Sequence, residues 1–149
     1  MGREQDRIRQ KMEANPIEEC NKVRQRHCPN LFGDFAATKD PRHPSYTDYS
    51  NKEMLGTMFY KGIAGIESMQ SMTYEFNREE IVGNMYGFFG AARKDYLPHG
   101  VTLNEYFERL DPAELQRVQQ KQVYEMIRRR SFEDDARFRK KWIVIVDGT

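Results

Sequence analysis

The stretch Ser50-Asn-Lys-Glu-Met-Leu-Gly-Thr-Met-Phe59 opens with a small polar residue and places a glutamate three positions later. In such a capping box, the Ser50 side chain accepts a hydrogen bond from a free helical N–H. The Glu53 side chain reaches back to the N–H of Ser50. The apolar residues that follow recur every three or four positions, which is the period of one helix face. The sequence therefore predicts an amphipathic helix that starts at Ser50.

Three later segments repeat this pattern, and each is predicted to start a helix. Their polar and glutamate positions are Asn77/Glu80, Thr102/Glu105 and Asp111/Glu114. Asp111 is the clearest start, because Pro112 occupies the first helical position, where a missing N–H costs nothing. Another helix is expected after the turn at 62–65. Buried helix faces are predicted for Met54, Leu55, Met58, Phe59, Ile63, Ile66, Met69, Met72, Phe76, Ile81, Val82, Met85, Phe88, Phe89, Leu115, Val118, Val123, Met126 and Ile127.

The first fifty residues lack the repeated capping pattern that begins at Ser50. Arg3–Glu13 is polar and compatible with a helix, Asn15-Pro16 interrupts it, and Ile17–His27 is expected to resume helically. The segment 30–50 contains prolines and almost no periodic apolar pattern, so it is predicted to be a long connecting loop. The tyrosines scattered along the chain are expected to be half-buried with their hydroxyls in water.

Composition limits the functional classes. A chain of 149 residues suits one domain. With 24 Lys plus Arg against 23 Asp plus Glu, any electrostatic case for nucleic acid must be local. No apolar run reaches membrane-span length and the first ten residues are charged, so a cytoplasmic protein without a membrane partner is the default expectation. Cys20 and Cys28 are expected to be free thiols, since these two sulfurs with His27 lack a fourth metal ligand.

The final segment, Lys141-Trp-Ile-Val-Ile-Val-Asp-Gly-Thr149, differs in kind from the helices. Its consecutive apolar and β-branched residues predict a strand over 141–146 that is buried on both faces. No other convincing strand precedes it, so its backbone groups are expected to lack a partner within this chain. The expected fold is therefore mainly α, followed by a single C-terminal strand whose sheet lies in residues beyond Thr149.

Two readings of Asp147 stay open. Asp-Gly after a strand is common in a tight turn. A carboxylate at a strand end is also the kind of ligand that a divalent metal requires for phosphoryl transfer.

A basic cluster lies between residues 128 and 141. Its members, candidates for contact with DNA phosphates, are Arg128, Arg129, Arg130, Arg137, Arg139, Lys140 and Lys141. The competing interpretation is that the first three complement the negative C-terminal end of a helix and the others form a solvated face.

Several stretches resemble the N-terminal region of DDE-class insertion-sequence transposases, in outline those associated with H-repeat elements. They are Asp40-Pro-Arg-His-Pro44, Met54-Leu-Gly-Thr-Met-Phe-Tyr60, Ala64-Gly-Ile-Glu-Ser-Met69 and Glu75-Phe76. Residues 141–149 resemble the first strand of the ribonuclease-H-like catalytic domain of this family. Together these stretches span about two thirds of the chain, and they divide it into an extension (1–50), a helical transposase-associated domain (51–140) and the start of a catalytic domain (141–149).

The resemblance implies a role in DNA transposition, with transposon ends and target DNA as partners and assembly into a homo-oligomer in the intact enzyme. It implies that two Mg²⁺ ions held by three acidic residues cut the DNA. Only Asp147 matches a catalytic and metal-binding position in this sequence. One carboxylate cannot hold both metals, so the chain by itself is expected to be inactive as a nuclease.

Two alternatives come from other functional classes. The first is a small helical DNA-binding or regulatory protein that uses residues 111–140 as its contact surface. The second is a helical interaction domain whose terminal strand would complete the sheet of a partner.

Overall fold

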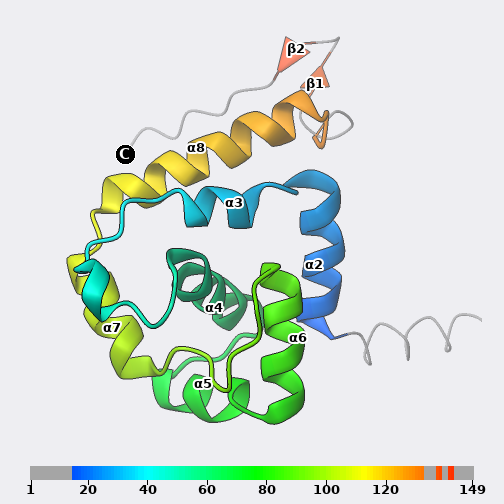
Figure 1. Ribbon diagram of the computed structural model, residues 1–149. Helices are drawn as coiled ribbons and strands as arrows, with labels where there is room; N and C mark the ends of the chain where they lie inside the picture. Colours follow the sequence, from blue (N-terminus) through cyan, green and yellow to red (C-terminus); the bar gives the residue numbers. More distant parts are fainter. Residues whose placement is uncertain (1–14, 133–136, 139–140, 143–149) are drawn as a thin grey trace, which may run out of the picture.

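The computed structural model describes residues 15–132, 137–138 and 141–142, and the described part is mainly helical, as predicted (Figure 1). The helix predicted at Arg3–Glu13 lies outside these residues. A short 3₁₀ turn, η1, spans Pro44–Tyr46. The α-helices of the described part are α2 (Pro16–His27), α3 (Leu31–Ala36), α4 (Asn51–Ile63), α5 (Met69–Phe76), α6 (Glu79–Phe89), α7 (Gly100–Arg109) and α8 (Pro112–Arg128).

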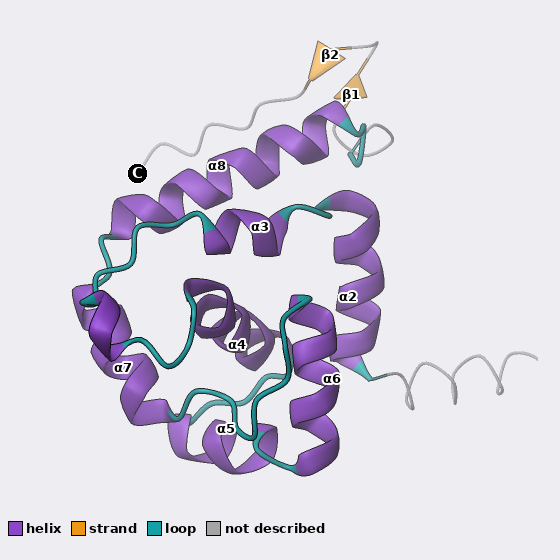
Figure 2. Cartoon of the chain, in the orientation of Figure 1, coloured by secondary structure: helices purple, strands orange, loops and turns teal. Residues whose placement is uncertain are grey.

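Helix α4 lies at the centre of the fold and is surrounded by the other helices (Figure 2). It contacts α2, α3, α6 and α7. Met54 and Tyr60 of α4 have no exposed surface, and the Tyr60 hydroxyl donates a hydrogen bond to Asn21 Oδ1 over 3.1 Å. The Tyr86 hydroxyl donates to the backbone oxygen of Tyr96 over 2.9 Å. The prediction that these two tyrosines would keep their hydroxyls in water is therefore wrong, because buried protein acceptors replace water.

The helix starts follow the sequence prediction in part. Ser50 and Glu53 form the predicted capping box of α4. Asp111 caps α8 by accepting a hydrogen bond from Ala113 N over 2.9 Å, but Glu114 binds the backbone N–H of Lys39 instead of reaching back. The other two starts differ from the prediction, since the N-cap of α6 is Arg78, one residue after Asn77, and the N-cap of α7 is His99, three residues before Thr102.

Asn77 does not cap α6 as predicted, because its side chain makes other hydrogen bonds. Its amide donates to Thr73 O over 2.8 Å and its Oδ1 accepts from Leu97 N over 2.7 Å, so it closes α5 and holds the chain before α7. A short polar side chain can bond backbone on either side, and the sequence pattern does not show which bond it makes.

The segment 30–50 is not only a connecting loop, because it contains α3. Leu31, Phe32 and Phe35 of α3 are buried, and they belong to the same apolar core as residues of α4, α6 and α7. A helix of six residues is too short to produce a visible apolar period, so the pattern could not reveal it. The residues on either side of position 50 therefore pack around one shared core.

The apolar stripe predicted to be buried on α8 is largely exposed. The side of α8 that faces the domain carries Glu114, Val118 and Gln122, whose exposed fractions are 6%, 7% and 8%. Leu115, Val123 and Ile127 are exposed instead. The spacing identified residues that share a face, but contact with α3 decided which face turns inward.

Two short strands follow α8. β1 (Arg137–Phe138) and β2 (Lys141–Trp142) pair antiparallel, with Arg137 opposite Trp142 and Phe138 opposite Lys141. The expectation that the terminal strand lacks any partner in this chain is thus wrong at its first two residues. Pairing so near in sequence has a small loop-closure cost. The predicted continuation over 143–146 lies outside the described residues.

Substitutions at two glycines of α4 would test the packing of this central helix. A Cβ at Gly56 would lie 2.6 Å from the Phe89 ring, whereas a Cβ at Gly62 would meet nothing within 4 Å. We expect Gly56→Ala to lower the free energy of unfolding by about 1–2 kcal/mol, because the buried ring must move. We expect Gly62→Ala, the matched control, to raise it by up to about 1 kcal/mol through helix propensity. Urea unfolding of both variants measures the two effects, and equal signs would contradict this packing.

Candidate nucleic-acid interface

The C-terminal ends of α2 and α8 lie next to one another, although about a hundred residues separate them in sequence (Figure 1). His27 Nδ1 is 2.6 Å from Ser131 Oγ, and Arg129 Nη1 donates to the backbone oxygen of Arg26 over 3.5 Å. Both helices end in basic residues, which complement the negative ends of the helix dipoles. Their meeting creates one basic surface from two elements. We call it the basic junction and define it by Arg26, Arg128, Arg129 and Arg130.

The four arginines of the basic junction are all exposed, and each has a different setting. Arg128 lies over the Tyr124 ring, with 6.0 Å between its Cζ and the ring centroid. Arg129 pairs with Glu125 over 2.7 Å. The backbone oxygen of Arg26 accepts the hydrogen bond from Arg129, and Arg26 itself is exposed. Four arginines against the one carboxylate of Glu125, which pairs with Arg129, give the junction a local excess of positive charge.

Arg130 has a left-handed backbone conformation, with φ of 57°. It ends α8 in the position where glycine is usual: Ser131 N donates to Met126 O over 2.9 Å and Arg130 N donates to Ile127 O over 3.1 Å. An L side chain in this region costs of order 1 kcal/mol. The chain thus keeps a basic side chain at a position where glycine would be unstrained.

The structure brings the predicted Arg128, Arg129 and Arg130 together with Arg26, which the sequence prediction missed. The available signal was the basic last turn of α2, where Arg24, Arg26 and His27 follow one another closely. Arg24 does not join the surface, because its guanidinium donates to Asn21 Oδ1 and lies 4.6 Å from the Phe32 ring centroid. Only the tertiary fold shows that α2 ends beside α8.

Of the remaining predicted site residues, the structure describes only the strand positions of two. Arg137 and Lys141 belong to β1 and β2, which follow the basic junction in the chain. Arg139, Lys140 and the predicted catalytic and metal-binding residue Asp147 lie outside the described residues. Within the part of the chain that is described, no three His, Cys, Asp or Glu side chains are grouped to share a metal ion. The Mg²⁺ prediction therefore stays a prediction.

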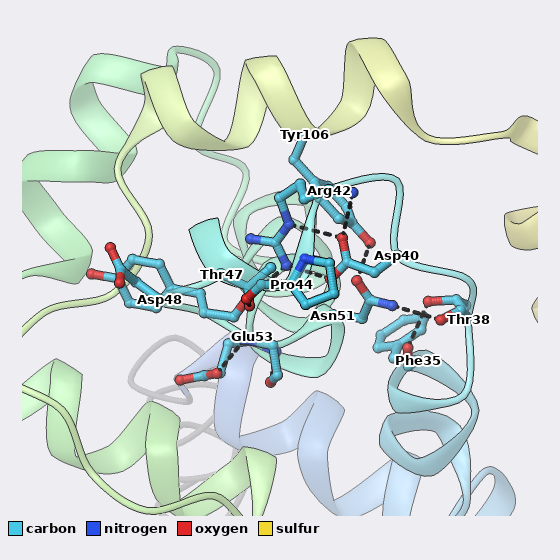
Figure 3. Close-up of polar contacts among 12 residues, drawn as sticks. Phe35, Thr38, Asp40, Arg42, Pro44, Thr47, Asp48, Asn51, Glu53 and Tyr106 are labelled. Carbon is cyan, nitrogen blue, oxygen red and sulfur yellow. Dashed lines mark hydrogen bonds and ion pairs between the residues drawn. The ribbon is translucent and has the colours of Figure 1, made fainter.

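A second polar cluster surrounds the Asp40-Pro-Arg motif (Figure 3). Arg42 donates to both oxygens of Asp40, from Nε over 2.9 Å and from Nη2 over 2.7 Å, and Nη2 also donates to Tyr49 O over 2.7 Å. The same guanidinium lies 4.9 Å from the centroid of the Tyr106 ring. Burial pushes the pKa of Asp40 upward, but the hydrogen bonds and charge of Arg42 outweigh it and hold this pKa below its usual value.

This cluster fixes the segment before α4 onto α4 and α7. The Tyr106 hydroxyl donates to Asn51 Oδ1 over 3.0 Å, and Asn51 Nδ2 donates to Thr38 O over 2.6 Å. Burial first, and the negative charge of Asp40 second, raise the pKa of Tyr106 to about 12. The phenol therefore stays a neutral donor at physiological pH. The motif acts as an internal brace, since its charged groups are already satisfied by one another.

Glu53 provides a neighbouring brace between α4 and the segment before α7. Its carboxylate is 4% exposed, accepts from Ser50 N over 2.6 Å and pairs with Lys94 over 2.7 Å. Burial raises the pKa of Glu53, but Lys94 and the Ser50 bonds more than compensate, so the net pKa is lowered. This carboxylate remains ionised and structural.

An apolar groove of about 670 Å³ runs between α2, α3 and α8. Cys20 and Cys28 line it together with residues such as Leu31, Phe35 and Met126. Burial raises the pKa of both thiols, so they are protonated and poorly nucleophilic near neutral pH. Neither cysteine is set up for covalent chemistry.

Comparison with protein-family models, with curated proteins and with solved structures finds no match to this chain. Among the helices described, none has the length and apolar character needed to cross a bilayer.

Proposed function

We propose that this chain contacts the DNA backbone through the basic junction, as the helical N-terminal region of a DDE-class transposase. The observation that supports the proposal is the convergence of exposed arginines from α2 and α8 on one surface. The stretches that resemble transposases supply the protein class. The left-handed Arg130 adds support, because strain of this kind is often retained where a side chain has a function.

The chemistry of the junction suits phosphate. Guanidinium groups present several N–H donors in a fixed plane, which matches the oxygens of a phosphodiester. Contacts of this type release counterions from DNA and carry no sequence information themselves. The basic junction would therefore position DNA, and sequence choice would come from other parts of the intact protein.

The catalytic steps that the resemblance implies belong to the intact enzyme. Cleavage of the element ends and attack on target DNA would use two Mg²⁺ ions held by three carboxylates. Within this sequence only Asp147 would take part, as one of those ligands. The proposal for this chain is accordingly DNA contact rather than catalysis.

DNA binding can be tested with a triple variant, Arg26→Gln/Arg128→Gln/Arg129→Gln. Fluorescence anisotropy with a labelled 30-base-pair duplex, over about 50–200 mM salt, gives the dependence of log K on log salt concentration. We expect the slope of the variant to be shallower by about 2–3, because each lost phosphate contact contributes about 0.9. Affinity at low salt should fall at least tenfold, since charge-assisted hydrogen bonds are the strong ones.

The matched control removes the same charge elsewhere. Arg78, Arg93 and Arg109 are exposed arginines outside the junction, and Arg78→Gln/Arg93→Gln/Arg109→Gln should leave the slope almost unchanged. Equal weakening by both triple variants would mean that the whole surface binds DNA without a defined interface. A wild-type slope near zero would remove the proposal altogether.

A second candidate is a helical regulatory or interaction protein. The observation that favours it is the exposure of Val123 and Tyr124 on α8, at 43% and 64%. Apolar side chains at an interface contribute through burial, which salt screens little. A salt-independent association of the protein, combined with absent DNA binding, would favour this candidate.

A further inference from the structure

The groove between α2, α3 and α8, which we call the α8 groove, is apolar and partly open to water. Three of its lining residues, Val23, Leu115 and Phe132, are 58%, 37% and 38% exposed. Its volume of about 670 Å³ lies within the ~300–1,000 Å³ that is usual for small-molecule sites. The buried or half-buried apolar residues of its lining are Leu31, Phe35, Phe59, Val118 and Met126.

The α8 groove is elongated along α8. Leu115 lies near the start of this helix and Met126 near its end, so these two lining residues are about 17 Å apart at ~1.5 Å per residue. Val118, Gln119 and Gln122 line the groove between them at helical spacing. This shape suits a chain-like ligand better than a round one.

The two ends of the α8 groove differ in polarity. Leu115 and Val118 line one end, whereas Arg24, His27 and Ser131 line the end where α2 and α8 finish side by side (Figure 1). His27 Nδ1 and Ser131 Oγ are 2.6 Å apart. Whichever of these two groups donates in that bond, the other keeps an N–H or O–H of its own. The polar end therefore offers a hydrogen-bond donor as well as a guanidinium.

The charge at the polar end is positive. Arg24 carries a permanent charge, and among the described residues that line the groove there is no Asp or Glu. The carboxylates of neighbouring residues are engaged by cations. Glu125 pairs with Arg129 over 2.7 Å. Asp34 of α3 pairs with Lys121 over 3.2 Å. The polar end is therefore complementary to an anion.

We propose that the α8 groove binds a free long-chain carboxylate, a single-chain amphiphile with an anionic head group. The alkyl chain would lie along α8 between Leu115 and Met126, and its burial would supply the affinity. The carboxylate would meet the Arg24 guanidinium and the donor left by His27 and Ser131, which would fix the direction of the chain. Three helices form the concave lining, which fits one chain, whereas a bilayer is met by a protruding apolar surface. This inference goes beyond DNA contact and stands whether or not the chain binds DNA.

Isothermal titration calorimetry of the full chain with dodecanoate, below its micelle concentration, tests the proposal. Dodecan-1-ol, which has the same chain length and no charge, is the matched probe. We expect saturable one-to-one binding of dodecanoate and about tenfold weaker binding of dodecan-1-ol, because the alcohol cannot form a charge-assisted bond with Arg24. Absence of saturable dodecanoate binding, or equal affinities for the two probes, would overturn the proposal.

Val23→Glu tests the apolar lining. Val23 is exposed, so the fold should tolerate the change, but a carboxylate beside the alkyl chain should weaken both probes about fivefold. Val101→Glu is the matched control, because Val101 of α7 is also exposed and lies outside the groove. It should leave both affinities within about twofold of the wild type. Equal losses in the two variants would contradict binding in the α8 groove.

Arg24→Gln tests the contact with the head group. We expect dodecanoate to bind about tenfold more weakly and dodecan-1-ol almost as before, so the preference for the anion is lost. Loss of folding would weaken both probes, so it cannot imitate this result. Arg78→Gln removes an exposed arginine outside the groove and should keep the preference. A preference retained in Arg24→Gln, or lost in Arg78→Gln, would count against the proposed head-group contact.

Two other occupants of the α8 groove would give different results. A second copy of the chain would appear in analytical ultracentrifugation, without any probe, as a dimer that Val23→Glu dissociates. A bilayer would appear as sedimentation with phosphatidylglycerol vesicles, weakened by Val23→Glu, in a chain that does not bind monomeric dodecanoate. Either result would overturn the assignment of a free long-chain carboxylate to this groove.

Discussion

Phe32→Ala is expected to lower the free energy of unfolding by about 3–5 kcal/mol, the largest effect of any single change proposed for this protein. Phe32 is 5% exposed and joins four aromatic rings of three helices. Its ring centroid lies 5.5 Å from Phe89, 5.8 Å from Tyr60, 5.9 Å from Phe35 and 6.5 Å from Phe59. Truncation would leave a cavity where α3, α4 and α6 meet, and it would also remove the ring over which Arg24 lies.

The measurement is urea unfolding followed by circular dichroism, with Tyr74→Ala as the control. Tyr74 is 73% exposed, so its removal should change stability by less than about 0.5 kcal/mol. A loss below about 1 kcal/mol for Phe32→Ala would mean that α3 is a peripheral element, as the sequence pattern of 30–50 suggested.

Arg42→Ala is expected to have the second largest effect, a loss of about 2–4 kcal/mol. The Arg42 side chain is 11% exposed, and its removal would leave the Asp40 carboxylate with only the backbone N–H of residue 42 as a donor and the backbone oxygen of Tyr49 without its donor. An unpaired, partly buried charge costs more than the ion pair contributes. Arg42→Lys should recover only part of the loss, because a single ammonium cannot reproduce the planar fork.

The control for the ion pair is Lys22→Ala. Lys22 and Glu19 also form an ion pair, but their side chains are 68% and 54% exposed, so the change should cost no more than about 0.5 kcal/mol. A similar cost for both variants would show that the brace around Asp40 is screened by water and contributes little to the fold.

The same brace gives the pH dependence its sign. The pKa of Asp40 in the folded chain lies below its ordinary value of 3.8, so the stabilisation by Arg42 is fully present above that pH. It is lost as pH falls through the lower, folded pKa. Acid unfolding of the wild type should therefore be steeper below about pH 4 than that of Arg42→Ala, and identical acid slopes would contradict the assignment.

Only some residues of the candidate site could be predicted from the sequence, and the same is true of the fold. Arg128, Arg129 and Arg130 could be proposed from sequence because they are consecutive, and a local excess of charge is visible in one dimension. Arg26 could not, since nothing in the sequence shows that α2 ends beside α8. The Asp40-Pro-Arg motif is visible in the sequence, but its role as a brace depends on Tyr49, Asn51 and Tyr106, which fold onto it.

The sequence by itself determined the mainly helical class, the capping box at Ser50 and the cap at Asp111, because these depend on bonds between residues a few positions apart. Tertiary structure decided the rest. It made α3 part of the core, placed Asn77 at the end of α5 rather than at the start of α6, and left Leu115, Val123 and Ile127 of α8 exposed. The physical reason is that periodicity fixes which side chains share a face, whereas the direction of that face depends on contacts between distant segments.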